Sequence, residues 1–263
     1  MQEIAKISPT EVRDLVAKNL NLLKLRHWLE ALDNDLAKLD DSKAQVLLSH
    51  LQKCTSLELS ERHTDAIRRR IESAKFIRLQ TVDQFDFEFN PSTRALKAGY
   101  LKLHNEVRQK ALVPRMILVG NTGLGKTHLA RAMGYTACQA GLSVLFTRAS
   151  QIVNALSAAK ATNTLENELK KYRRPQLLII DELGYVTMDI EASNLFFQVI
   201  TDRHDRGLGT IVTTNFAFGH WNQIFASDST AVVIVERLTT EAEVFYVEGP
   251  SYNQQKRKAK SNK

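Results

Sequence analysis

Eight consecutive residues of this chain have the types and spacing of a loop that binds phosphate. Its glycines can take positive φ and leave the backbone bare, so that successive N–H groups point inward and hold an anion. A lysine and a threonine end the loop, as the pattern G-x-x-x-x-G-K-[ST] requires. The residues are Gly120, Asn121, Thr122, Gly123, Leu124, Gly125, Lys126 and Thr127.

Two side chains of this loop could act directly on a nucleotide. Lys126 can reach the β- and γ-phosphates, and the Thr127 hydroxyl can bind magnesium. An apolar run at 116–119 precedes the loop and a helical sequence follows it, so the positive end of a helix dipole would add to the cradle. A glycine-rich turn that matches by chance is the alternative, and the strand and helix on either side disfavour it.

Two acidic residues follow a second apolar run, at 177–180. Consecutive large aliphatic residues are typical of a strand buried on both faces of a parallel sheet. Asp181 would lie at the carboxyl end of this strand, where open α/β sheets bind ligands, and could hold magnesium. Glu182 could polarise the attacking water as a general base. A core strand with a solvated acidic end is the alternative, and the glycine loop makes it the weaker one.

Two other positions could contact the nucleotide. Asn215 follows an apolar strand predicted at 210–214, and with Thr214 it could sense the γ-phosphate by hydrogen bonding. A strand followed by an Asn-favoured turn explains the same residues equally well. His128 lies next to the loop and belongs to the candidate nucleotide-binding segment, although local packing or capping is its favoured role.

Three arginines are candidates for a catalytic cation. Arg237 precedes the last predicted strand and could neutralise transition-state charge on the nucleotide of a neighbouring subunit. From the residues alone, a salt bridge to Glu236 or Glu241 is favoured. For Arg203 and Arg206 a solvated helix end is the favoured interpretation.

An alternation of strands and helices would position these residues. It predicts an α/β core, at 116–253, with a parallel five-stranded sheet and helices on both faces. The predicted strands are 116–119, 143–147, 177–181, 210–214 and 244–248. The predicted helices are 126–140, 149–159, 164–172 and 191–206.

A small all-α domain is predicted at 1–80. Ser8 and Ser42 each start a capping box, and a third helix is predicted at 57–75. One face of that helix is basic, and it is either solvated or in contact with phosphates; both interpretations stay open. Its first candidates for binding DNA are Arg68, Arg69 and Arg70, with Arg62 and Arg78 nearby.

The remaining segments are connections. Residues 85–91 end in Asn-Pro and predict an extended linker, and helical spacing resumes at 97–112. We assign 81–115 to this linker and the first helix of the ATPase region. The basic segment 254–263 is predicted to be a disordered tail.

The charge distribution indicates a polyanionic partner. The chain of 263 residues has a net charge of +7. Residues 1–115 carry 20 Lys and Arg against 16 Asp and Glu, whereas residues 116–253 carry 11 against 13 and the last ten carry 5 against none. Positive charge thus gathers outside the predicted nucleotide-binding core, which suggests nucleic acid as the partner.

Composition excludes several other classes of protein. Hydrophobic content of 43% and charged content of 25% are typical of a globular chain. We expect no membrane span, because no apolar run approaches the required length, and no signal peptide, because the first residues lack its pattern. Cys54 and Cys138 have no metal or redox spacing and are expected to be reduced thiols of a cytoplasmic protein.

Taken together, these motifs resemble the IstB/DnaC-like branch of the AAA+ ATPases, and most closely the IstB-type transposition helpers of bacterial insertion sequences. The strings GKTHLA and DELGY are the most specific. The resemblance covers about residues 70–252 and includes 74–76, 85–87, 125–130, 180–185, 194–200, 214–216, Trp221, 236–238 and 249–252.

This resemblance implies an AAA+ core without a separate C-terminal lid. It implies binding of ATP and Mg²⁺, ATP-driven assembly of a ring or helical homo-oligomer on double-stranded DNA, and recruitment of a DDE-type transposase. By the same resemblance, Lys126 and Thr127 match the Walker A residues and Asp181 and Glu182 match Walker B. Asn215 then matches sensor I and Arg237 matches the arginine finger.

The chain departs from the family pattern at three places. Asn121 and Thr122 stand where Pro or Ser is frequent, Asp202 interrupts a basic run, and Asn253 replaces the arginine of the usual Ser-Tyr-Arg ending. Any role of that last arginine is therefore in doubt.

An ATP-dependent DNA-binding assembly factor for transposition is the leading functional hypothesis. A replicative-helicase loader of the DnaC type is the alternative within the same fold, but it would need a helicase-docking segment that the sequence does not reveal. A small-molecule P-loop kinase and a scaffold that binds ATP with little turnover are less favoured. The basic segments disfavour the kinase, and the intact Asp181–Glu182 pair disfavours the scaffold.

Overall fold

The computed structural model describes residues 8–252 and divides the chain after Arg68 into two compact units. The first unit is all-α, as predicted. It holds α1 (Pro9–Leu22), α2 (Arg26–Leu36) and most of α3 (Asp41–Ser73). The predicted capping box is present, because the amide of Ser8 donates to Glu11 at 2.7 Å and the amide of Glu11 donates to the Ser8 hydroxyl at 3.3 Å. The core consists of Val16, Leu20, Leu32 and Leu48.

One helix, α3, replaces the two that the sequence analysis predicted at Ser42 and at 57–75, and that prediction is wrong. Residues 52–56 contain neither glycine nor proline, so no residue breaks the helix there. The capping group also differs, since the carboxylate of Asp40 accepts the Lys43 amide at 2.9 Å. The basic tail predicted at 254–263 lies outside the described residues.

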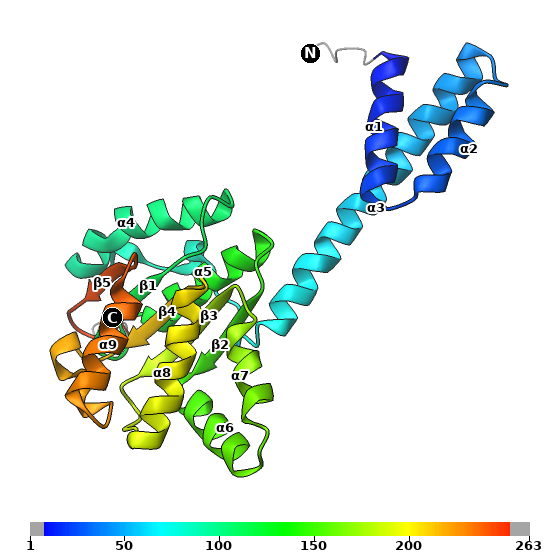
Figure 1. Cartoon of the computed structure of the whole chain (residues 1–263). Helices are drawn as coiled ribbons and strands as arrows, with labels where there is room; N and C mark the ends of the chain where they lie inside the picture. Colours follow the sequence, from blue (N-terminus) through cyan, green and yellow to red (C-terminus); the bar gives the residue numbers. More distant parts are fainter. Residues whose placement is uncertain (1–7, 253–263) are drawn as a thin grey trace. The chain divides into compact units, whose positions relative to one another are not determined.

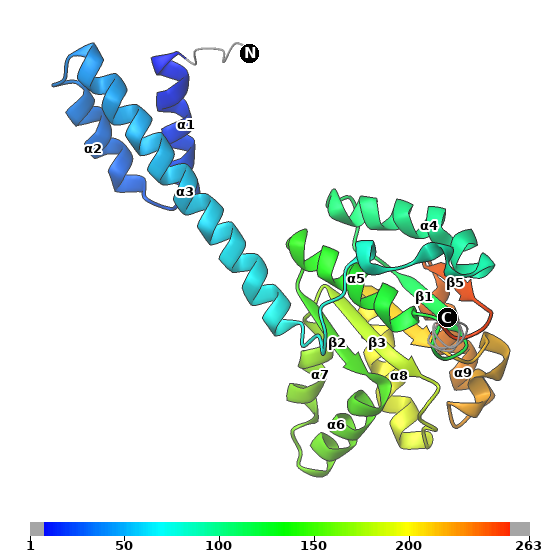
Figure 2. The same ribbon diagram turned by 180° about the vertical axis from the view of Figure 1, so that it is seen from behind.

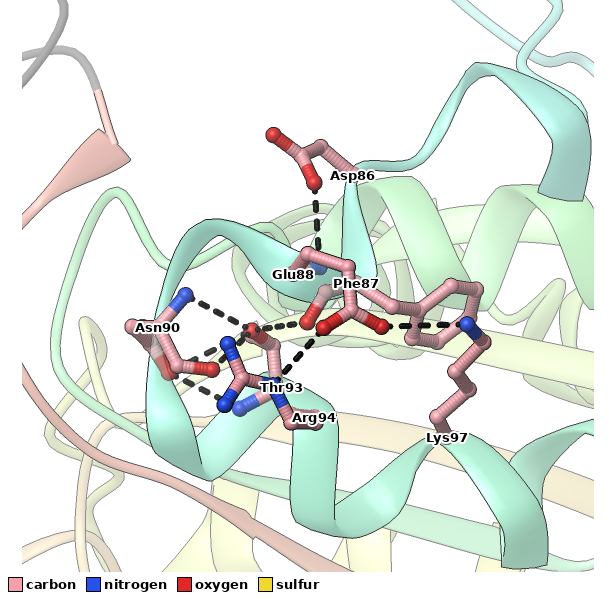
Figure 3. Close-up of polar contacts among 7 residues, drawn as sticks. All are labelled: Asp86, Phe87, Glu88, Asn90, Thr93, Arg94 and Lys97. Atoms are coloured by element: carbon pink, nitrogen blue, oxygen red, sulfur yellow. Dashed lines mark hydrogen bonds and ion pairs between the residues drawn. The ribbon is translucent and has the colours of Figure 1, made fainter.

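The segment predicted as an extended linker, at 85–91, contains a 3₁₀ turn, η2 (Phe87–Phe89), which corrects the prediction. Another 3₁₀ turn, η1 (Val82–Gln84), precedes it. The carboxylate of Asp86 accepts the Glu88 amide at 3.0 Å, and the Thr93 hydroxyl donates to the carbonyl of Phe87 at 2.9 Å (Figure 3). Short polar side chains thus form hydrogen bonds with nearby backbone groups and stabilise the turns. In an extended chain the same backbone groups would bond to water.

The helix α4 (Pro91–Arg108) begins at the Asn-Pro pair, earlier than predicted. The Asn90 side chain accepts the Thr93 amide at 2.8 Å and so caps the helix. Glu88 pairs with Arg94 at 2.7 Å and with Lys97 at 3.1 Å, which ties η2 to the first turns of α4 (Figure 3).

A five-stranded parallel sheet forms the second unit, as predicted, with strand order β2-β3-β4-β1-β5 (Figure 1). Each observed strand lies within about two residues of its predicted position. The strands are β1 (Met116–Gly120), β2 (Val144–Arg148), β3 (Leu177–Leu183), β4 (Gly209–Thr214) and β5 (Glu243–Val247).

Helices cover both faces of the sheet (Figures 1 and 2). Because side chains alternate along a strand, Met116 and Leu118 pack on one face and Ile117 and Val119 on the other. The first face packs against α4 and α5 (Lys126–Gln139). The second face packs against α6 (Ala149–Ala161), α7 (Leu165–Arg173), α8 (Ile190–Asp205) and α9 (Asp228–Thr239), and the short η3 (Phe218–Gln223) contacts α9.

Because the strands are parallel, the carboxyl ends of β1, β3 and β4 lie on the same side of the sheet, which we call its carboxyl edge. Among residues 8–252, β5 is the last strand, and no helical domain follows it. None of the helices in this part of the chain combines the length and the apolar character needed to cross a membrane.

Candidate active site

The glycine loop connects β1 directly to α5, as the sequence predicts. Gly120, Gly123 and Gly125 have φ values of 152°, 80° and 86°. The value at Gly125 is left-handed, and a Cβ atom there would collide with the ring of Phe85. Glycine is therefore required at position 125 for two reasons. The backbone has a left-handed conformation, and the aromatic ring of Phe85 leaves no room for a side chain.

The ammonium group of Lys126 lies inside the loop. Its Nζ donates to the carbonyls of Gly120 at 2.6 Å and Asn121 at 2.7 Å. Burial lowers the pKa of Lys126, and the negative charge of Asp181 opposes that shift. The loop thus holds one cation next to the N-terminus of α5, where anionic phosphate groups are favoured.

The hydroxyl of Thr127 and the carboxylate of Asp181 come together although they are far apart in the chain. Thr127 Oγ1 donates to Asp181 Oδ1 at 2.8 Å, and Thr213 Oγ1 donates to the same oxygen at 2.6 Å. Asp181 is only 1% exposed. A buried carboxylate is thereby fixed behind two hydroxyl groups, one from the loop and one from β4.

These oxygens fit Mg²⁺. The ion prefers hard oxygen ligands, and it usually takes one or two from the protein and the rest from phosphates and water. Within residues 8–252 no group of three or more His, Cys, Asp and Glu residues could hold a metal by itself. Thr127 and Asp181 would therefore hold the ion only together with a bound triphosphate.

Glu182 follows Asp181 in a left-handed conformation, with φ of 60°. Its amide donates to Thr213 Oγ1 at 3.0 Å, and its carboxylate is 3.2 Å from Nε of Arg148, the last residue of β2. The side chain of Glu182 is 42% exposed. A carboxylate held at the carboxyl edge and open to water can accept a proton from a water molecule.

Asn215 follows β4 and lies beside Gly184, where a Cβ atom would collide with the Asn215 amide oxygen. Among the described residues, this buried oxygen has no hydrogen-bond partner. Buried polar groups without a partner are uncommon, so this oxygen is free to accept a hydrogen bond from water or from a donor group of a ligand.

A hydrogen bond joins the glycine loop to the loop after β3. The Thr122 hydroxyl is 2.7 Å from the hydroxyl of Tyr185. The Tyr185 amide donates back to the Glu182 carbonyl at 3.3 Å, which closes a tight turn between the two residues. The turn that positions Glu182 is thereby attached to the loop that holds Lys126.

One cavity of about 490 Å³ collects most of these groups, a volume typical of small-ligand sites. Of the predicted site residues, those at 122–128 line it together with Glu182 and Asn215. Gly120, Asn121 and Asp181 do not line the cavity. The first two accept hydrogen bonds from Lys126, and Asp181 accepts one from the lining residue Thr127. The sequence analysis missed further lining residues, which are Arg78, Gln80, Gln84, Phe85, Asp86, Phe89, Arg131, Tyr185, Thr213 and Tyr252.

The missed residues come mostly from the segment before α4. His128 holds this segment, because its Nε2 lies 2.9 Å from the carbonyl of Thr81 and its Nδ1 lies 3.0 Å from the Gln80 amide. A carbonyl only accepts, so Nε2 carries the proton and Nδ1 accepts. The Phe85 ring packs edge-on against the imidazole at 5.3 Å. The alternating phenylalanines at 85–89 were the available signal, because an exposed linker rarely repeats them.

Comparison with known proteins decides the family. The family of IstB-like ATP binding proteins matches residues 18–261. This chain belongs to that family. It is 34% identical over 235 residues to the ATP-binding protein assigned to insertion sequence IS232 of Bacillus thuringiensis subsp. berliner, covering 89% of this chain and 92% of the relative. It is 32% identical over 250 residues to the one assigned to IS21 of Pseudomonas aeruginosa, covering 94% and 90%.

Solved structures support the fold of this IstB-like protein. The structure of DnaI matches with a TM-score of 0.56 at 18% identity, covering 70% of this chain and 98% of DnaI. The DnaC helicase loader matches with a TM-score of 0.53 at 21% identity, covering 64% and 96%. The predicted AAA+ P-loop core and the predicted resemblance to IstB-type proteins are both confirmed.

Arg237 of the IstB-like protein does not line the cavity. Its guanidinium pairs with Asp205 at 3.1 Å and lies 5.9 Å from the centre of the Phe197 ring. The salt bridge is thus to the end of α8 rather than to Glu236 or Glu241, the partners favoured from the sequence. Arg237 makes no contact with the glycine loop of its own chain.

Arg203 corrects a prediction, since it is buried and not at a solvated helix end. It donates to the carbonyls of Tyr172, Pro175, Gln176 and Gly209 and to the hydroxyl of Thr210. Burial lowers the pKa of Arg203, while these acceptors favour its charged form. The guanidinium therefore fastens α8 to the ends of α7 and β4. The prediction failed because sequence alone does not show which carbonyls surround a side chain.

The three candidate DNA-binding arginines are consecutive on α3, so their side chains point in different directions around the helix. Arg68 is exposed and pairs with Asp65 at 2.6 Å, and Arg69 is exposed as well. Arg70 is half-buried, and its charge counteracts the rise in the pKa of Cys138 that burial causes. Of the three, Arg68 and Arg69 are accessible to a partner.

Proposed function

We propose that this IstB-like protein binds ATP with Mg²⁺ in the cavity beside the glycine loop and hydrolyses it. The observation that carries the proposal is the hydrogen bond of 2.8 Å between Thr127 and Asp181, beside a glycine loop whose carbonyls hold the Lys126 ammonium at 2.6 and 2.7 Å. A cation, a hydroxyl and a buried carboxylate at a helix N-terminus are the groups that a Mg-triphosphate requires.

The residues divide the reaction between them. Lys126 offsets negative charge on the β- and γ-phosphates, and Asn215 donates its amide N–H to a γ-phosphate oxygen. Glu182 takes a proton from water as the water oxygen bonds to the γ-phosphorus and the bond from that phosphorus to the bridging oxygen breaks. ADP and inorganic phosphate leave. Mg²⁺, when bound, offsets the charge that develops on the phosphate oxygens.

We further propose that ATP drives assembly of a homo-oligomer on double-stranded DNA, and that the assembly assists a DDE-type transposase. The motivation is the family and the names of its relatives, which belong to insertion sequences. The basic excess in residues 1–115 supports contact with DNA through the N-terminal helices. Only the likeness to DnaI and the DnaC helicase loader favours a helicase loader instead, and that likeness shows the fold alone.

Nucleotide binding and ATPase measurements on Lys126→Ala test this proposal. The variant should lose ATP affinity and DNA-stimulated ATP hydrolysis together, because the loop loses its only lysine. Lys102→Ala, which removes an exposed lysine of α4, is the matched control and should behave like the wild type. Unchanged ATP affinity in Lys126→Ala would rule out the phosphate-loop assignment. ATPase activity stimulated by a small-molecule acceptor, and not by DNA, would favour the kinase.

A further inference from the structure

A second groove, of about 610 Å³, runs along the edge strand β2 and shares no lining residue with the candidate active site. Four consecutive strand residues, at 144–147, line it. Ser73, Lys75 and Ile77 form one wall, and residues of α6 and α7 form the other. The groove thus follows the open edge of the sheet between the two helical layers.

The edge of β2 presents unpaired backbone groups to this groove. The Leu177 amide donates to the Ser143 carbonyl at 3.0 Å, so alternate residues from 143 face β3 while Val144 and Phe146 face outward. The Phe146 amide donates to the Ala74 carbonyl at 2.8 Å. Within residues 8–252, no partner on that side bonds the Val144 amide, the Val144 carbonyl or the Phe146 carbonyl. Ala74 thus covers part of this edge, and Val144 and Phe146 are only 5% and 3% exposed. The backbone groups that stay free can pair with another chain.

The side chains around this edge combine an apolar surface with positive charge. Ile77 is 62% exposed, and Tyr172 and Pro175 lie opposite it. Three cations line the same groove, and its single acid, Glu168, bonds to one of them, Lys171, and to the Tyr172 hydroxyl. The cations are Lys75, Lys171 and Arg174.

We propose that this groove binds an extended acidic segment of a partner protein, which pairs with the free backbone groups of β2 at Val144 and Phe146. Backbone hydrogen bonds would supply affinity, alternate apolar side chains would contact Ile77, and carboxylates would pair with Lys75 and Arg174 and compete with Glu168 for Lys171. A DNA backbone would use the cations but neither the apolar wall nor the unpaired strand edge. A second copy of this chain, with its net charge of +7, is a poor source of an acidic segment.

Selection of short random peptides displayed on phage, with the full-length protein as bait, tests the inference. The enriched peptides should alternate Asp or Glu with β-branched residues. In fluorescence anisotropy, a synthetic peptide of that sequence should bind Lys171→Glu/Arg174→Glu about tenfold more weakly. Lys102→Glu, an exposed charge reversal on α4, is the matched control and should bind normally. Lys75→Glu, on the opposite wall, should repeat the loss. Both this variant and Lys171→Glu/Arg174→Glu should keep the wild-type unfolding temperature.

Hydrogen exchange of the Val144 amide identifies the mode of binding. The peptide should slow this exchange, because the amide gains an acceptor on its open side. Enrichment of basic peptides or of no consensus, or equal binding by the charge-reversal variants, would overturn the proposal. Slower Val144 exchange with a DNA duplex, or with rising concentration of the protein alone, would assign the groove to nucleic acid or to self-association instead. ATP binding in the cavity is independent of all these outcomes.

Discussion

The carboxyl edge of the sheet, where its parallel strands end, differs from the amino edge, where they begin. The two differ in how many of the groups needed for phosphate chemistry a single chain places there. At the carboxyl edge, Thr127 is hydrogen-bonded to Asp181, and the glycine loop that ends in Thr127 holds the Lys126 ammonium by its carbonyls. At the amino edge, Arg237 lies with Arg115 and with residues at the start of β4, and it is absent from the lining of the cavity. On the proposed function, one chain supplies the groups that bind the phosphates, and Arg237 would act on the nucleotide of another chain.

The largest expected effect concerns the amino edge. Arg237→Ala should leave ATP binding by a single subunit intact and lower turnover by about 10³-fold or more, because a cation supplied in trans stabilises charge that develops in the transition state. Steady-state ATPase rates of the assembled protein, beside nucleotide affinity of the monomer, measure the two quantities.

Mixing experiments separate the action of Arg237 in trans from a structural role. Arg237→Ala subunits keep the loop and Lys126→Ala subunits keep the arginine, so mixtures that co-assemble should recover part of the activity. Asp205→Asn is the control, since it removes the ion pair at 3.1 Å and retains the guanidinium. If co-assembled mixtures stay inactive, Arg237 acts within its own subunit or only structurally.

At the carboxyl edge, Glu182→Gln should stop turnover without loss of ATP affinity. The amide cannot take a proton from water, and loss of a general base costs about 10²–10⁴-fold in rate. Single-turnover hydrolysis with radiolabelled ATP measures this, and the ATP-loaded oligomer should persist on DNA. Hydrolysis at the wild-type rate would show that another group is the base.

A smaller effect is expected on the helix α3. Arg68→Gln/Arg69→Gln should weaken DNA binding equally for unrelated duplexes and flatten the log–log salt dependence by about 1.8, because two phosphate contacts are lost. Over a fourfold range of salt this corresponds to roughly a tenfold difference in affinity. Arg70→Gln, at the half-buried neighbour, should change the slope little. An effect confined to one DNA sequence would contradict contact with phosphates.

The same two edges show what the sequence can predict. The glycine loop and the acids after β3 could be placed because a parallel sheet brings the carboxyl ends of its strands to one edge. The burial of Arg203 and the aromatic wall from Phe85 to Phe89 could not, because they depend on contacts between distant segments. The continuity of α3 was not predicted because a new helix was placed at residue 57, although residues 52–56 contain no glycine or proline that would end the first one.

The smallest expected effect tests whether the carboxyl edge acts as one unit. The Tyr185–Thr122 hydrogen bond, at 2.7 Å, connects the turn that holds Glu182 to the glycine loop. Tyr185→Phe removes only the hydroxyl and should lower kcat about two- to tenfold, since a hydrogen bond contributes roughly 0.5–1.5 kcal/mol. ATP affinity should change less than kcat, because Lys126 and Thr127 keep their contacts.

A double-mutant cycle decides whether this tether accounts for the loss. If the two hydroxyls act through each other, Thr122→Val should lower kcat as Tyr185→Phe does, and the double variant should be no slower than either. Thr122→Ser keeps the hydroxyl and should restore the wild-type rate. Additive losses, or an equal loss in Thr122→Ser, would mean that the two side chains act separately and that the turn at Glu182 is positioned by Thr213 and Arg148 alone.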